Sequence, residues 1–462
     1  MGTEGRKTYS YGDIQRISLP LAITMGTTMV MEFTDRIFLA RYSMASIAAA
    51  MPAGVVAFWL ISFFMGVAGY VHVFIAQYTG AGDHRRVGGM LWQGIWFAVG
   101  SGLILAALSP SAGPIFRLIG HPSEIQALER IYFQILCQGA GIHILGVALA
   151  GFHAGRGQTR IVMVAHLVGT VVNIPLDYAL INGFGPLPEL GIRGAGIATV
   201  TAWAVITGCF VVTVFTSAND RQYGVRQNFA PSADGFLRLL RFGVPAGAQF
   251  ATETFAFAFF INAVGRLGET ALAVSNIVFS INSLAFMPMV GLSMGASILV
   301  GQSLGRDLPD QAAGAVTRTI HIAMGYTVAM AAVFLAFPEP IFSLFRPHDL
   351  SPSEFSEMVG TGTVILRFVV LYMLFDAGYM VFMGALKGAG DTRFIMICVA
   401  TTSILVLVVP LVAGMALFNA GLIYAWSCLT VFIASLYGVT YGRYRRGGWR
   451  KIRVIERESE TA

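Results

Sequence analysis

The sequence predicts an all-α membrane protein with twelve transmembrane helices, arranged as two six-helix bundles related by a pseudo-twofold axis along the membrane normal. Three observations predict this fold. Of the 462 residues, 56% are hydrophobic and only 12% are charged, whereas soluble domains carry about 25% charged residues. Twelve apolar stretches are long enough to cross a bilayer. The second half of the sequence also repeats features of the first half.

Each predicted span has about 20 mostly apolar residues, which is the length of a helix that crosses the hydrocarbon core. The polar N-terminus leads into the first span without a small-residue cleavage site, so we expect that span to stay in the membrane. In chain order, the predicted spans are 17–40, 47–76, 88–112, 128–150, 161–183, 194–216, 237–262, 271–300, 315–337, 361–385, 394–416 and 420–441.

The Lys and Arg residues predict the orientation of these spans. With twelve spans both termini lie on one side, and the segments on that side carry 22 of the 30 Lys and Arg residues. Such residues gather in cytoplasmic loops. We therefore expect a multi-pass protein of the inner (plasma) membrane with both termini in the cytoplasm.

The two halves of the chain match residue by residue. At an offset of 225 residues, Pro20 corresponds to Pro245 and Gly66 to Gly291. The same offset relates Arg16 to Arg241, Ala48 to Ala273, Gln77 to Gln302, and Gly80 to Gly305. Six spans in each half give parallel repeats, an architecture of alternating-access carriers. The predicted domains are an N-terminal bundle at 1–220, a cytoplasmic linker at 221–235, a C-terminal bundle at 236–443 and a basic tail at 444–462.

Carboxylates inside the predicted spans are candidate functional residues. Each costs roughly 2.5 to 3.5 kcal/mol at the centre of a spanning helix, so each calls for a partner or a function. The candidates are Glu32, Asp35, Asp177, Glu253 and Asp376. Glu32 and Arg36 have the i,i+4 spacing of a structural ion pair. For the other four acids, we favour a functional role.

Helix geometry groups these acids by depth. A rise of about 1.5 Å per residue puts Asp35, Asp177 and Thr199 in the outer half of the N-terminal bundle. Asn173 lies one helical turn from Asp177, on the same face. These hard oxygen donors suit Na⁺ or a shuttled proton. Glu253 and Asp376 fall near the midplane of the C-terminal bundle.

Several motifs, in their order along the chain, resemble the multidrug and toxic compound extrusion (MATE) family and, within it, the NorM-like bacterial branch. The resemblance covers essentially the whole chain. It is carried by Pro20 with Glu32-Phe-Thr-Asp35, Ala76-Gln77-Tyr-Thr-Gly80-Ala81-Gly82, Asn173-Ile-Pro-Leu-Asp177, Gly194-Ala195-Gly-Ile-Ala-Thr199, Gly243-Val-Pro245 before Glu253, and Asp376 before Gly384-Ala385-Leu386-Lys387-Gly388.

The resemblance implies roles for individual residues. It implies an N-lobe cation site, able to hold Na⁺, at Asp35, Asn173, Asp177 and Thr199. It also implies that Glu253 and Asp376 are C-lobe acids for cation coupling and that Pro20 lies at a bend in the first helix. From the residues alone, Pro20 could equally start that helix. The chain departs from the family at Arg36, where a small or polar residue is usual, and it has no acid in helix nine, so Na⁺ and H⁺ both remain open as coupling ions.

The sequence therefore predicts a cation-coupled antiporter, not an enzyme, that exports amphipathic, often cationic organic compounds or drugs. We expect the halves to rock about the linker, at 217–234. The alternatives are a lipid-linked precursor flippase, which should have a strongly cationic cavity, and a membrane-embedded enzyme. We expect no cofactor besides the coupling ion, no nucleic-acid partner, a monomer in the bilayer, and structural roles for Cys137, Cys209, Cys398 and Cys428.

Overall fold

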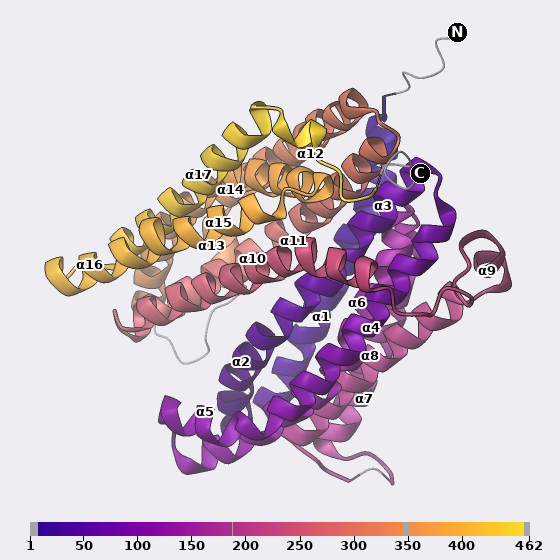
Figure 1. Cartoon of the computed structure of the whole chain (residues 1–462). Coiled ribbons are helices and arrows are strands. Elements are labelled where there is room, and N and C mark those ends of the chain that lie inside the picture. The colour runs from indigo at the N-terminus through magenta and orange to yellow at the C-terminus, as the bar shows by residue number, and fades with distance from the viewer. Residues whose placement is uncertain (1–7, 187, 345–351, 457–462) are drawn as a thin grey trace. The chain divides into compact units, whose positions relative to one another are not determined.

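The computed structural model describes residues 8–186, 188–344 and 352–456, and each predicted span falls on a helix (Figure 1). The predicted span at 47–76 corresponds to two successive helices, and the predicted span at 394–416 contains a π-helical turn. The elements of the first half are α1 (Tyr11–Tyr42), α2 (Met44–Gly69), α3 (Val71–Ala81), α4 (His84–Leu108), η2 (Ser109–Ser111), α5 (Ala112–Ile119), α6 (Ser123–Gly155), α7 (Thr159–Asn182), α8 (Ile192–Val214) and α9 (Ser217–Tyr223).

The second half has the same pattern of long helices. Its elements are α10 (Ala233–Gly265), α11 (Glu269–Gly305), α12 (Pro309–Ala336), α13 (Pro338–Ser343), α14 (Pro352–Ala389), α15 (Thr392–Thr402), η3 (Ser403–Val408), α16 (Val409–Phe418), α17 (Leu422–Arg445) and η4 (Gly448–Lys451). Within the described residues, eleven spans are long and apolar enough to cross a membrane. The twelfth, α10, has 33 residues but carries Asp234, Arg238, Arg241 and Glu253.

The contacts divide the chain into two compact units. Unit 1 contains Met1–Ala22, Thr252–Val300 and Pro309–Ile452, and unit 2 contains Ile23–Ala251, Gly301–Leu308 and Arg453–Ala462. Three long helices, α1, α10 and α11, therefore begin in one unit and end in the other. These units are not the two predicted bundles, whose boundaries remain a prediction. The first seven residues of the predicted N-terminal bundle and the last six of the predicted basic tail lie outside the described part of the chain.

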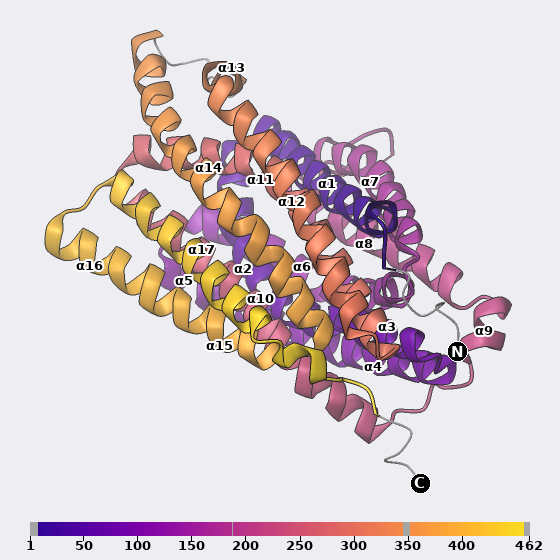
Figure 2. The same ribbon diagram turned by 90° about the horizontal axis from the view of Figure 1, so that it is seen from above.

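Small residues allow the helices of each unit to approach closely. In unit 2, α6 packs against α2, α4 and α8, and α7 packs against α8 (Figure 1). A Cβ atom added at Gly102 of α4 would lie 2.7 Å from the Cα atom of Gly141 in α6. In unit 1, α14 packs against α12 and α17 (Figure 2).

The internal repeat reappears as two matched helix contacts. In unit 2, a Cβ atom added at Gly66 of α2 would lie 2.6 Å from the Cα atom of Gly247 in α10. In unit 1, a Cβ atom added at Gly291 of α11 would lie 2.7 Å from the Cα atom of Ala22 in α1. The offset of 225 residues relates Gly66 to Gly291 and Ala22 to Gly247, so the repeat creates equivalent close approaches.

A second matched pair of contacts lies at the ends of α3 and α11, within unit 2. A Cβ atom at Gly80 would collide with the backbone of Gln302, and one at Gly305 would collide with the backbone of Gln77. The repeat relates Gly80 to Gly305 and Gln77 to Gln302. Glycine is required at both positions because any side chain would separate the two backbones.

The linker between the halves is packed against α4. The indole N–H groups of Trp92 and Trp96 donate hydrogen bonds to the carbonyl oxygens of Val225, at 2.7 Å, and Phe229, at 2.9 Å. The backbone N–H of Ser232 donates to the side-chain oxygen of Gln93, 3.2 Å away. The segment that we expect to act as a hinge is therefore held along its length by one helix of unit 2.

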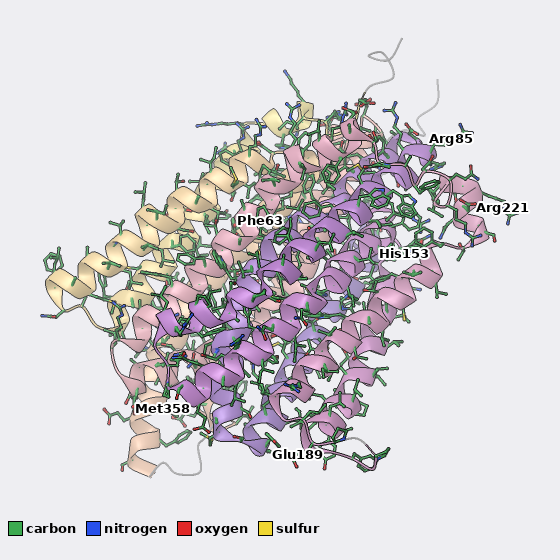
Figure 3. The ribbon with its side chains drawn as sticks, turned by 60° about the horizontal axis from the view of Figure 1, so that its bottom comes forward. Phe63, Arg85, His153, Glu189, Arg221 and Met358 are labelled. Atoms are coloured by element: carbon green, nitrogen blue, oxygen red, sulfur yellow. The ribbon has the colours of Figure 1, made fainter. Side chains whose placement is uncertain are left out.

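Charged side chains mark the two ends of unit 2. Arg85 and Arg221 lie at one end, and Glu189, in the loop between α7 and α8, lies at the other (Figure 3). This separation agrees with the predicted sides of the membrane, because Arg gathers on the cytoplasmic side.

Candidate functional site

The first group of predicted site residues comes together inside unit 2. Asp35 on α1, Asn173 and Asp177 on α7, and Thr199 on α8 are all buried, with exposed fractions of 7%, 0%, 0% and 8%. The i,i+4 spacing on α7 turns Asn173 and Asp177 to the same face. The three helices thus bring two carboxylates, an amide and a hydroxyl into one buried group.

Most polar atoms of this group have no hydrogen-bond partner. The Thr199 hydroxyl lies 3.2 Å from Asp35 Oδ2 and 3.0 Å from the carbonyl oxygen of Ala195. Within the described residues, Asp35 Oδ1, both oxygens of Asp177 and Asn173 Oδ1 accept no hydrogen bond from a protein donor, and Asn173 Nδ2 donates none. Asp35 and Asp177 face each other within hydrogen-bonding range, but two carboxylates can bond only if one carries a proton.

This donor set fits a small hard cation. Carboxylate, amide and hydroxyl oxygens are the ligands that Na⁺ and other hard cations prefer. In the part of the chain that the structure describes, no group of three or more His, Cys, Asp or Glu side chains could hold a metal ion. Two carboxylates side by side away from water repel each other unless a proton or a metal cation lies between them. The geometry is therefore suited to binding one positive charge.

Tyr132 on α6 also belongs to this neighbourhood, although it is not among the site residues predicted from the sequence. Its side chain is 9% exposed, and it lies close enough to Asp35 and Asp177 to interact with their charges. Its ring also lies 3.8 Å from the position of a Cβ atom built at Gly54. Tyr132 is on a helix that carries none of the predicted site residues, so no spacing rule connects it to the acids.

The second group lies in unit 1. Glu253 on α10 and Asp376 on α14 are half-buried and close enough for their charges to repel each other. The hydroxyl of Tyr379 donates a hydrogen bond to Glu253 Oε1. Tyr379 is 4% exposed and follows Asp376 at the i+3 position on α14. That spacing places it on the same face of the helix and is the signal that could have identified it.

A basic side chain also acts on the second group. Lys387, near the end of α14, is close enough to attract the charge of Glu253. Glu253 and Lys387 lie on different helices, α10 and α14, so no spacing along the sequence indicates this contact. The second group therefore combines acidic, phenolic and basic side chains from two helices, whereas the basic side chain that acts on the first group is Arg36, the neighbour of Asp35 on α1.

Glu32 and Arg36 lie beside the first group on α1, close enough for their charges to act on Asp35. Glu32 and Arg36 form the predicted i,i+4 pair, with Arg36 Nη2 3.8 Å from Glu32 Oε2. Both side chains are more than half exposed, and pairs of this kind contribute little to stability. Pro20 lies inside α1, and Pro245 lies inside α10. The alternative that Pro20 starts its helix is therefore wrong, while its proposed role in bending α1 remains a prediction.

The comparisons with known proteins agree with the fold and with the resemblance in the sequence. The family model described as MatE matches residues 20–179 and 245–412. A probable multidrug resistance protein NorM from Thermotoga maritima is 26% identical over 455 residues, which cover 96% of this chain and 94% of the relative. The multidrug resistance protein PmpM from Pseudomonas aeruginosa is 28% identical over 395 residues, which cover 83% of this chain and 80% of PmpM.

A solved structure has the same fold. It is a transporter of the MOP superfamily from Pyrococcus furiosus, with a TM-score of 0.85, 22% identity, and coverage of 96% of this chain and 100% of the other. The twelve-helix fold with two bundles is thus confirmed. Because the family model matches both halves and most of the residues, the chain belongs to the MatE family of membrane transporters and is not an enzyme.

Proposed function

We propose that this transporter exports amphipathic, often cationic organic compounds in exchange for Na⁺ or H⁺ that moves inward. The relatives from Thermotoga maritima and Pseudomonas aeruginosa are named as multidrug resistance proteins, which supports a broad range of organic substrates. The protein works as a monomer in the inner (plasma) membrane, with both termini in the cytoplasm. The excess of Lys and Arg on the predicted cytoplasmic segments supports that orientation.

One observation carries the proposal of cation coupling. Asp35 and Asp177 are buried side by side, and within the described protein Asp35 Oδ1, both oxygens of Asp177 and the side-chain amide of Asn173 have no hydrogen-bond partner. A buried polar atom without a partner costs about 1 to 3 kcal/mol, and a charged one costs more. A transporter can keep such costly buried atoms if a cation binds to them during part of the transport cycle and offsets the cost. The group is therefore proposed to be the site of the coupling ion.

The matched helix contacts support alternating access. The close approaches Gly66–Gly247 and Ala22–Gly291 occur where α1 and α10, the first long helix of each half, contact a helix of the other half. Each depends on small residues, which let two helix backbones meet directly. Repeat-built carriers move one half against the other.

The test is transport by the purified protein in liposomes. A fluorescent cationic dye is followed while an opposing gradient of Na⁺, and then of pH, is imposed at zero membrane potential. We expect one gradient to drive dye movement and to identify the coupling ion, while a variant with both Asp35→Asn and Asp177→Asn stays at the level of empty liposomes. Dye movement that is the same with and without either gradient would refute cation coupling.

A further inference from the structure

The chain after α17 leaves the helix in a fixed direction. Trp449, in the short helix η4, is 1% exposed, and its ring stacks on Tyr444 with ring centroids 5.0 Å apart. The indole N–H of Trp449 donates to the carbonyl oxygen of Tyr444, 3.0 Å away. Residues 453–456, which follow this buried turn, belong to unit 2.

Glu456 bridges two helices at the end of this segment. Its two carboxylate oxygens pair separately with Arg86, at the start of α4, and with Arg238, near the start of α10. The Glu456 side chain is only 17% exposed. Asp83 and Asp234 hold the same two arginines, with N–O distances of 3.1 and 3.2 Å. The arginines are therefore positioned by their own helices, and Glu456 connects them.

Two further contacts fix the segment before Glu456. The backbone N–H of Val454 donates to the side-chain oxygen of Gln77 on α3, 3.1 Å away, and Val454 is 2% exposed. Arg453 Nη2 lies 2.8 Å from Asp307 Oδ1, in the turn between α11 and α12. The segment thus contacts α3 and α4 from the first half of the sequence, and α10 and the α11–α12 turn from the second half.

These contacts require the two sets of helix ends to be close together. The same ends meet at Gly80 and Gln302, where the backbones leave no room for a side chain. A single carboxylate can pair with arginines on α4 and α10 only while both arginines lie within about 4 Å of it. Separation of α10 from α4 must break at least one of the two ion pairs.

We propose that the segment 453–456 is a latch, which stabilises the state in which the predicted cytoplasmic ends of α3, α4, α10 and α11 are closed. The proposal rests on alternating access, since only a transporter that opens on this side needs to release the latch. The latch also accounts for part of the positive charge in the tail. Arg453 of the latch pairs with Asp307, and Arg450, just before the latch, pairs with Asp310 at 3.0 Å, so both arginines bind protein carboxylates.

The test measures the distance between α4 and α10, and its result does not depend on transport activity. Spin labels are placed at Gly89→Cys on α4, where a Cβ atom meets no neighbour, and at Leu237→Cys on α10, where the native side chain is 64% exposed. The four native cysteines are replaced by alanine. Distances between the labels are measured by pulsed electron resonance in the full-length protein in lipid nanodiscs, with Glu456 intact and with Glu456→Gln or Arg453→Gln.

We expect the fraction of molecules with the longer distance to rise about fivefold in Glu456→Gln, the effect of losing partly buried ion pairs, and to rise less in Arg453→Gln. Lys451→Gln is the matched control, because Lys451 lies in the same tail, is exposed, and makes no ion pair within the described residues. It should leave the distances unchanged. Equal distance distributions in Glu456→Gln and in the protein with Glu456 intact would overturn the latch.

Dye transport by the same variants separates the latch from the proposed function. If the latch is correct, Glu456→Gln still couples dye movement to the ion gradient, although its rate changes. Coupled transport together with unchanged distances refutes the latch alone. A lack of ion-driven transport in the protein with Glu456 intact refutes the antiporter, whatever the distances show.

Discussion

The two groups of acids differ in how the protein compensates their charge. Asp35 and Asp177 are buried in unit 2, where no described protein donor reaches the oxygens of Asp177. Glu253 and Asp376 are half-buried in unit 1, where Tyr379 donates to Glu253 and Lys387 attracts its charge. The first group thus needs an added cation more strongly than the second. The two halves of the repeat thus carry acidic groups that differ in how much they need an added cation.

The largest effect is expected from the first group. Asp35→Asn and Asp177→Asn each preserve the shape of the side chain and remove its charge. Breaking a buried charge interaction costs roughly 3 to 5 kcal/mol, so ion-driven dye efflux should fall by about a hundredfold or more. Efflux from everted membrane vesicles, normalised to the amount of protein in the membrane, measures this loss.

Glu32→Gln is the control for that measurement. Glu32 lies on the same helix as Asp35 and close enough for the two charges to interact, but its side chain is more than half exposed and lies 3.8 Å from Arg36 Nη2. Its substitution should change efflux by less than about twofold, because an exposed pair contributes little. If Asp177→Asn transports as well as Glu32→Gln does, the first group does not need a cation more strongly than the second group.

A smaller effect is expected from the second group. Glu253→Gln and Asp376→Asn should each reduce efflux by about tenfold, because these charges are partly exposed and a lysine acts on one of them. The dependence of the rate on Na⁺ or H⁺ concentration distinguishes two roles. An altered ion dependence indicates coupling, whereas an altered dye dependence alone indicates substrate binding. Unchanged efflux and ion dependence would make these two acids structural.

The fold could be predicted from the sequence because its determinants are local or periodic. The length of each apolar stretch defines a span, and a constant offset between Gly66 and Gly291 defines the repeat. The change of unit within α1 and α10 could not be predicted in the same way. It depends on backbone contacts, such as Gly66 with Gly247, between residues far apart in the sequence.

The site shows the same limit. Asn173 and Asp177 could be assigned to one group because they lie one turn apart on a single helix. Tyr132 and Lys387 act across helices, on acids for which no sequence spacing indicates a contact. The residues that carry charge were thus predictable from the cost of burying them, while several of the groups that tune those charges became visible only in the structure.

The smallest expected effect, and the most specific test of the contrast between the groups, comes from Tyr379→Phe. The substitution removes one hydrogen-bond donor from Glu253 and keeps the ring, so at about 0.5 to 1.5 kcal/mol for one hydrogen bond efflux should fall about threefold. Tyr441→Phe, on α17, is the control, because Tyr441 stacks on Tyr437 and has no contact with either acid within the described residues. The decisive measurement combines Tyr379→Phe with Glu253→Gln. If the hydroxyl acts through Glu253, the double variant should transport like Glu253→Gln alone, since the two substitutions remove the same interaction. Fully additive losses would mean that Tyr379 acts independently of Glu253, and the second group would then lose the internal compensation that distinguishes it from the first.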